Sequence, residues 1–148
     1  MKRKMVLVML VLATAVAAYA EGLPAPVQEQ LAASKYVYIA TQRKDGSFSK
    51  PAEIWFLFHK GAVWVASPPT TWRVRRIKAG RTAAKIIVGK PDGASFEAKG
   101  EIVKDPEVNT VLLETYAKKY PEGWSKFESK FREGFRDGSR VLIKYTPK

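Results

Sequence analysis

The stretch Ala62–Ile77, AVWVASPPTTWRVRRI, contains the change of pattern on which the fold prediction rests. Its first part, Ala62–Ala66, is rich in β-branched and aromatic residues, which favour a strand. Two prolines interrupt that strand, and Thr70 or Thr71 can then cap a helix over residues 72–79. The sequence thus predicts a strand that leads through a short connection into a basic helix.

Similar strand-like segments lie on both sides of this stretch, several of them bounded by glycine-containing turns. The predicted strands are Lys35–Thr41, Phe48–Phe58, Ala62–Ala66, Thr82–Val88, Ser95–Val103 and Arg140–Tyr145. Short antiparallel strands can remove their exposed edges by closing into a barrel. We therefore expect a mainly β domain with peripheral helices, an α+β fold built on a six-stranded antiparallel barrel.

Two further helices are expected before the last strand. Asp105 and Pro106 form a strong helix start, with an acidic N-cap and a proline at the first position. Pro121 ends this helix, and the next one carries an aromatic stripe at helical spacing: Trp124, Phe127, Phe131 and Phe135. We interpret the stripe as a helix-packing or dimer-packing surface. With no repeat and no linker in the sequence, residues 21–148 are expected to form a single domain.

Residues 1–20 have the pattern of a secretory signal peptide. Lys2–Lys4 is basic, Met5–Ala18 is almost wholly apolar, and Ala18–Ala20 is a small-x-small cleavage site. The apolar run is shorter than the 18 to 20 or so residues that span a bilayer, which argues against the alternative of a membrane anchor. We expect cleavage after Ala20 and a secreted or periplasmic chain, with no membrane span left after cleavage.

The composition excludes several classes of chemistry. The 148 residues include no cysteine and one histidine, which removes disulfides, thiolate nucleophiles and Cys-ligated metals and makes a histidine metal cluster improbable. No metal site is therefore expected. The formal net charge is +12, and cleavage after Ala20 removes three basic residues and no acidic one, which leaves +9.

Positive charge is concentrated in the middle of the chain. Residues 54–91 contain no acidic residue and eight basic ones. Within this region Thr70, Thr71, Trp72 and Arg73 combine two hydroxyls, a helix start and a guanidinium, a combination that suits phosphate. The alternative is a basic helix face exposed to solvent.

The order of elements resembles the flavin-binding split-barrel superfamily of pyridoxamine 5′-phosphate oxidase-like and deazaflavin-dependent proteins. The resemblance is carried by Lys50–Phe56 (KPAEIWF), Ala62–Ser67 (AVWVAS) and Thr71–Ile77 (TWRVRRI), and it extends from about Lys35 to the final strand. It implies a split barrel, a homodimer with its cofactor at the subunit interface, and a flavin phosphate as ligand.

The resemblance also implies site residues, by position. Ser67 matches a hydroxyl at the end of the third strand, Arg73 matches the basic residue that meets the phosphate, and Thr71 precedes it as a second hydroxyl. The segment of Glu53, Ile54 and Trp55 matches the strand that runs along the flavin ring. Arg73 stands where lysine is commoner, and Trp72 stands where pyridoxamine phosphate oxidases have a basic residue. That specific activity is therefore not expected.

The resemblance implies FMN first and deazaflavin second, with oxidoreductase chemistry supplied by the flavin. No catalytic residue and no substrate can be assigned. Two other classes of function stay open. One is a non-enzymatic exported protein that binds haem, another tetrapyrrole or a small anion, with His59 as a weak candidate for an axial ligand. The other is a basic nucleic-acid or surface-binding module, which the core-like spacing of the aromatic residues disfavours.

The signal-peptide pattern makes a direct prediction about the exported protein. Intact-mass analysis of the secreted or periplasmic chain should give the mass of a polypeptide that begins at Glu21. A mature chain that retains residues 1–20 would contradict the predicted localisation.

Overall fold

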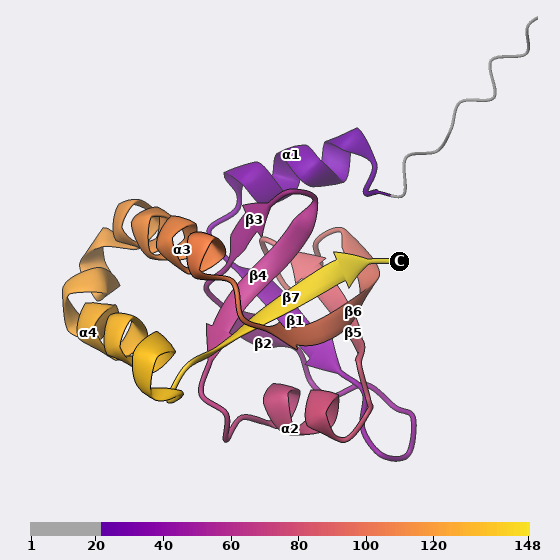
Figure 1. Ribbon diagram of the computed structural model, residues 1–148. Helices are drawn as coiled ribbons and strands as arrows, with labels where there is room; N and C mark the ends of the chain where they lie inside the picture. Colours follow the sequence, from indigo (N-terminus) through magenta and orange to yellow (C-terminus); the bar gives the residue numbers. More distant parts are fainter. Residues whose placement is uncertain (1–21) are drawn as a thin grey trace, which may run out of the picture.

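The computed structural model describes residues 22–148, so the predicted signal peptide and its cleavage site lie outside the described residues. The strands of the described chain form one curled antiparallel sheet, and the helices lie around it (Figure 1). The strands are β1 (Val37–Thr41), β2 (Ala52–Ile54), β3 (Leu57–His59), β4 (Ala62–Ser67), β5 (Ala83–Val88), β6 (Ser95–Val103) and β7 (Val141–Pro147). The helices are α1 (Ala25–Ala33), α2 (Trp72–Lys78), α3 (Pro106–Lys119) and α4 (Pro121–Asp137).

The sheet has the strand order β2-β1-β5-β6-β7-β4-β3, and every pairing in it is antiparallel. Its two edge strands, β2 and β3, are consecutive in the chain and are separated only by Trp55 and Phe56. One stretch of chain therefore runs from one edge of the sheet to the other, which brings the edges together into a barrel. The predicted fold class is confirmed, with seven strands where six were expected, because the predicted strand Phe48–Phe58 is divided at this point.

The strand divides where helix α3 supplies hydrogen bonds to its backbone. The Tyr116 hydroxyl donates to the Trp55 carbonyl at 2.9 Å, and Lys119 Nζ donates to the Phe56 carbonyl at 3.2 Å. The Phe56 N–H donates to the Tyr120 hydroxyl at 3.1 Å, while that hydroxyl donates to the Lys35 carbonyl at 2.6 Å. Backbone groups without a sheet partner are costly to bury. Side chains from the end of α3 thus replace the sheet hydrogen bonds that Trp55 and Phe56 lack.

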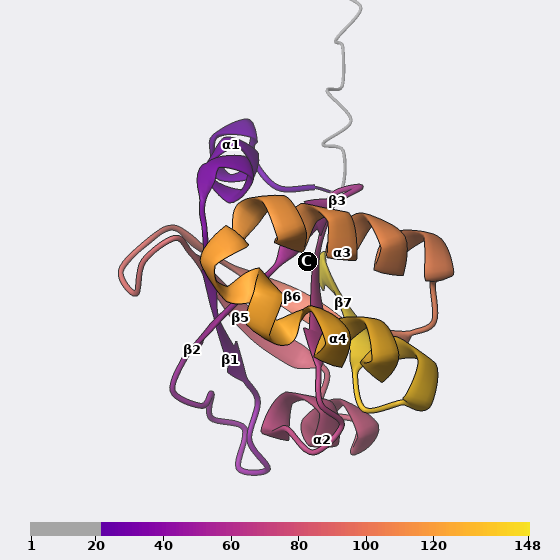
Figure 2. The same ribbon diagram turned by 90° about the vertical axis from the view of Figure 1, so that its left-hand side faces the viewer.

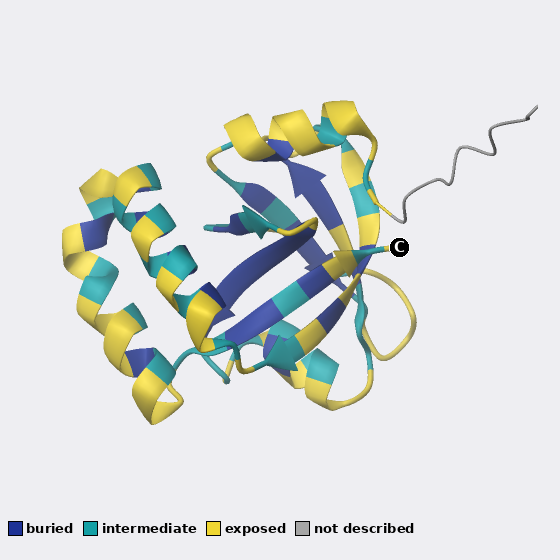
Figure 3. Ribbon diagram, turned by 45° about the horizontal axis from the view of Figure 1, so that its top comes forward, coloured by how far each residue is buried: buried dark blue, intermediate teal, exposed yellow. Residues whose placement is uncertain are grey.

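The core has two parts, one on each face of the sheet. Inside the barrel lie the buried side chains Val37, Phe56, Val65, Ile86 and Tyr145, among others. On the outer face, α3 and α4 pack as a pair beside β3, β4 and β7, and they bury the other part of the core (Figures 2 and 3). Three residues of the aromatic stripe of α4, Trp124, Phe131 and Phe135, belong to this second part, together with the buried Trp64 of β4. Its interpretation as a packing surface agrees with the structure.

Helices α1 and α2 lie at opposite ends of the barrel (Figure 1). The seven residues of α2 follow β4 after a short proline-containing connection, as the sequence predicts. Gly80 follows the helix with a φ of +85°, a left-handed conformation that glycine adopts readily. Within residues 22–148, no helix combines the length and the apolar character needed to cross a bilayer.

Removing the Tyr120 hydroxyl tests the division between β2 and β3. In Tyr120→Phe, the buried Phe56 N–H and the Lys35 carbonyl both lose a partner, so the free energy of unfolding should fall by about 2 kcal/mol. Denaturant unfolding measures this change. The matched control is Tyr38→Phe, whose hydroxyl donates to Glu53 on the surface at 2.7 Å, and it should change stability by less than about 0.5 kcal/mol. Equal effects of the two variants would contradict the role assigned to Tyr120.

Candidate anion and ring site

Arg73 of α2 is the central residue of the candidate site. Its guanidinium reaches back to the end of β4, where Nη1 donates to the hydroxyl of Ser67 at 3.0 Å. The side chain is partly buried, and this burial lowers the pKa of Arg73 from its ordinary value. Neither of the two ion pairs formed among residues 22–148 involves Arg73. A guanidinium withdrawn from water without an acidic partner is costly, which makes this position a candidate for binding an anion.

The hydroxyls beside Arg73 form a short hydrogen-bonded chain. Ser67 is fully buried, and its Oγ lies 3.0 Å from Oγ1 of Thr71, which in turn donates to the Pro68 carbonyl at 3.0 Å. Because the Thr71 proton is used on Pro68, the Ser67 hydroxyl is the donor in the bond between the two side chains. Thr71 occupies the N-cap position of α2, but its side chain caps no helix N–H, contrary to the expected cap. Arg73 is therefore the donor that this group offers to a ligand.

A basic hollow of about 370 Å³ lies on one side of Arg73, between α2 and the loop from β1 to β2. Its lining contains four cationic side chains, three hydroxyl-bearing ones and no carboxylate: Arg43, Lys50, Arg73, Arg76, Thr41, Ser49 and Thr71. Arg76 is fixed in place because its Nη1 donates to Thr41 Oγ1 at 2.7 Å. Positive charge and hydroxyl groups without a competing acid are the chemistry that binds phosphate.

An aromatic hollow of about 340 Å³ lies on the other side of Arg73, between the β2–β3 junction and the paired helices α3 and α4. Its apolar lining includes the rings of Trp55, Tyr116, Phe127 and Phe131. The Trp55 ring is held by stacking on Tyr120, with the two centroids 4.2 Å apart and the planes 6° from parallel. Rings fixed in this way can contact a planar ligand.

The charged groups of the aromatic hollow are two arginines and one glutamate. Arg73 and Arg140 supply the guanidiniums, and Arg140 lies 5.5 Å from the centroid of the Phe131 ring. The carboxylate is that of Glu53, which accepts a hydrogen bond from Tyr38. Arg73 lines both hollows, so a single guanidinium stands between a phosphate-like environment and an aromatic one.

The eight residues predicted for the site do not all meet in one place. Glu53, Ile54 and Trp55 line the aromatic hollow, Thr71 and Trp72 line the basic one, and Arg73 lines both. Ser67 is buried beneath Arg73, and Thr70 lines neither hollow. Trp72 is 64% exposed, and the guanidiniums of Arg75 and Arg76 each lie 5.3 Å from the centroid of its ring.

Sequence reasoning missed several residues of the basic hollow. Arg76 is one of the eight basic residues in positions 54–91 and was not predicted as a site residue. Its spacing of three from Arg73 places both side chains on one helix face. The sequence around Thr41, Arg43 and Ser49 contains no pattern that indicates an anion site. These residues lie at the end of β1 and in the loop after it, which only the tertiary structure brings beside α2.

His59, considered above for haem, lies at the end of β3, where its carbonyl accepts from the Trp64 indole at 3.0 Å. It lines neither the basic nor the aromatic hollow. In the described part of the chain, no group of three or more metal-ligating side chains is close enough to hold an ion.

Comparison with solved structures identifies the fold of the chain. No family model and no curated protein matches the sequence. Among solved structures, a protein related to general stress protein 26 from Clostridium acetobutylicum, of the pyridoxinephosphate oxidase family, is similar with a TM-score of 0.58 at 19% identity, over 82% of this chain and 81% of that one. An F420 reductase is similar with a TM-score of 0.52 at 21% identity, over 81% and 92% of the two chains. The fold is the split barrel.

The split barrel also occurs in HutZ, the heme storage protein of Vibrio cholerae, which is similar with a TM-score of 0.58 at 12% identity, over 86% of this chain and 91% of that one. The resemblance seen in the sequence is thus confirmed for the fold. At these identities the likeness establishes the split barrel alone. What this split barrel binds has to be argued from its own residues.

Proposed function

We propose that this protein is an exported split-barrel protein that binds a flavin phosphate, FMN in the first place and deazaflavin in the second. The observation that carries the proposal is the guanidinium of Arg73, which is partly buried, forms no ion pair within residues 22–148 and borders both a basic and an aromatic hollow. A ligand with a phosphate at one end and a planar ring at the other matches this pair of environments.

The residues present fit each half of such a ligand. Arg73, Arg76 and Lys50 would hold the phosphate by charge-assisted hydrogen bonds in the basic hollow. Trp55, Phe127 and Phe131 would contact the ring and exclude water from it. A bound flavin would supply hydride or electron transfer, and we assign no protein acid or base to that chemistry.

The export proposal constrains how the cofactor is acquired. A chain that crosses the membrane unfolded cannot bring a cofactor that only its folded state binds. Flavin would therefore be captured outside the cytoplasm, and binding would depend on the affinity of the folded protein for free flavin.

Removing the Arg73 guanidinium tests the proposed phosphate contact. Arg73→Ala should weaken FMN binding about ten- to a hundredfold, because a charge-assisted hydrogen bond is lost. Riboflavin has the same ring without the phosphate, so its affinity should fall far less. Isothermal titration of each variant with both ligands measures the difference.

Arg75→Ala is the matched control, because Arg75 is an exposed arginine of the same helix that lines neither hollow. Its affinity for FMN should stay close to that of the unchanged protein. If both variants weaken FMN equally, the helix contributes only a diffuse positive field. If neither variant changes FMN binding while both remain folded, the phosphate is held elsewhere.

We also propose a homodimer, as the split-barrel resemblance implies. Residues 22–148 expose two large apolar side chains, Trp72 at 64% and Phe48 at 36%, and Trp72 lies at the rim of the basic hollow. Size-exclusion chromatography with light scattering should give twice the mass of one chain. A monomer at working concentration would count against a cofactor site shared by two subunits.

A specific feature favours haem or another tetrapyrrole as the second candidate ligand. The aromatic hollow has guanidiniums from both Arg73 and Arg140, which could pair with two carboxylates on a planar ligand. The visible absorption spectrum of the purified protein, or of the protein after reconstitution, separates the candidates. A flavin spectrum supports the first and a Soret band the second.

A further inference from the structure

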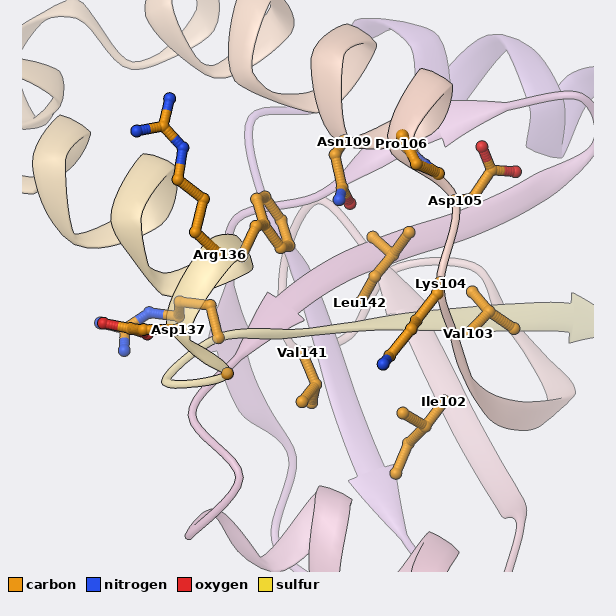
Figure 4. A pocket seen from close by; sticks show the side chains of 13 residues that line it. Ile102, Val103, Lys104, Asp105, Pro106, Asn109, Arg136, Asp137, Val141 and Leu142 are labelled. Atoms are coloured by element: carbon orange, nitrogen blue, oxygen red, sulfur yellow. The ribbon is translucent and has the colours of Figure 1, made fainter.

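A third hollow, of about 460 Å³, lies outside the candidate flavin site. The start of α3, the end of α4 and the adjoining parts of β6 and β7 enclose it (Figure 4). Its only residue in common with the aromatic hollow is Arg140. The proposed flavin function makes no use of this space.

The base and walls of this hollow are apolar. Val103 of β6, Phe135 of α4 and Leu142 of β7 line it, and Leu142 is buried. Burial of further apolar surface here is favourable, in proportion to the area removed from water. The hollow therefore favours a ligand with a hydrocarbon body.

The charged groups around the hollow leave an excess of positive charge. Three cationic side chains and two carboxylates line it: Lys104, Arg136, Arg140, Asp105 and Asp137. Asp105 accepts from the Val108 N–H at 3.1 Å, and Asp137 accepts from the Ser139 N–H at 2.8 Å. Lys104 and Arg140 form none of the ion pairs found among residues 22–148. Lys104 extends from the β6–α3 connection toward Val141 (Figure 4).

The stem of the Arg140 side chain packs against α4 at the boundary between this hollow and the aromatic one. Its side chain packs so closely on Gly134 of α4 that a Cβ there would lie 2.5 Å from the Arg140 Cγ. Its backbone N–H donates to the Gly134 carbonyl at 3.1 Å. A cation fixed in this way loses little conformational freedom when it pairs with an anion.

Asn109 adds a specific polar group. Its side chain comes from the second turn of α3 and points toward Leu142 (Figure 4). The Oδ1 atom is buried and has no hydrogen-bond partner in the described protein. A buried acceptor without a donor is unfavourable, so a ligand that supplies a hydroxyl here gains affinity.

We propose that this hollow binds a small amphipathic hydroxy acid. The hydrocarbon body contacts Val103, Phe135 and Leu142, the carboxylate pairs with the cations at the rim, and the hydroxyl donates to Asn109 Oδ1. The proposal does not depend on flavin binding, because this hollow shares no residue with the basic hollow and only Arg140 with the aromatic one. The test uses the protein without added flavin.

Three probes that differ by one group each test the three parts of the argument. Isothermal titration with 2-hydroxyoctanoate, octanoate and octanol should give affinity in that order, with one 2-hydroxyoctanoate bound per chain. Asn109→Leu should remove the advantage of the hydroxy acid over octanoate, which we expect to be about two- to tenfold. Lys104→Gln should weaken both acids about three- to tenfold and leave octanol unchanged.

Two control variants separate this hollow from general charge and from the flavin site. Lys85→Gln removes an exposed lysine of β5 and should have no effect on either acid. Arg73→Gln should also have no effect, since Arg73 does not line this hollow. The proposal is wrong if none of the probes binds at millimolar concentration, or if octanol binds as tightly as the acids. It is also wrong if Arg73→Gln weakens the acids while Lys104→Gln and Asn109→Leu do not.

Discussion

The hydrogen bonds from α3 to the backbone of Trp55 and Phe56 are the contacts on which the rest of the structure depends. A strand that passes from one edge of a sheet to the other must leave the sheet briefly, and its buried backbone groups then need other partners. The Tyr116 and Tyr120 hydroxyls and the Lys119 ammonium supply them. Burial raises the pKa of both tyrosines, so these hydroxyls keep their protons at neutral pH, and it lowers the pKa of Lys119 to about 8.

The same contacts also position the candidate site. They hold Trp55 against Tyr120, and they dock the helix pair α3–α4 beside the β2–β3 junction, so that Phe127 and Phe131 face Trp55. The aromatic hollow exists because a strand break and a helix end meet there. Loss of the Tyr120 hydroxyl would therefore disturb the aromatic hollow as well as stability.

Uncompensated positive charge is the second recurring property of the molecule. Within residues 22–148, neither Arg73 nor Arg140 forms an ion pair, although Arg73 is partly buried and Arg140 packs closely on Gly134 between two hollows. Such arrangements reduce stability unless an anion completes them. The three hollows thus all contain cationic side chains but differ in what surrounds the charge: hydroxyls in the first, aromatic rings in the second, and a hydrocarbon surface with an amide in the third.

The sequence by itself determined the local elements, because their signals are local. β-Branched runs predicted the strands, Asp105 and Pro106 predicted the start of α3, and the region around Arg73 stood out because acidic residues are absent from positions 54–91. Only the tertiary structure decided where Phe48–Phe58 divides, since that depends on hydroxyls more than sixty residues further along the chain. The tertiary structure also brought Arg43 and Thr41 beside Arg76, and it left Asn109 Oδ1 without a hydrogen-bond partner among the described residues. Both outcomes depend on the relative positions of elements, which no local sequence pattern encodes.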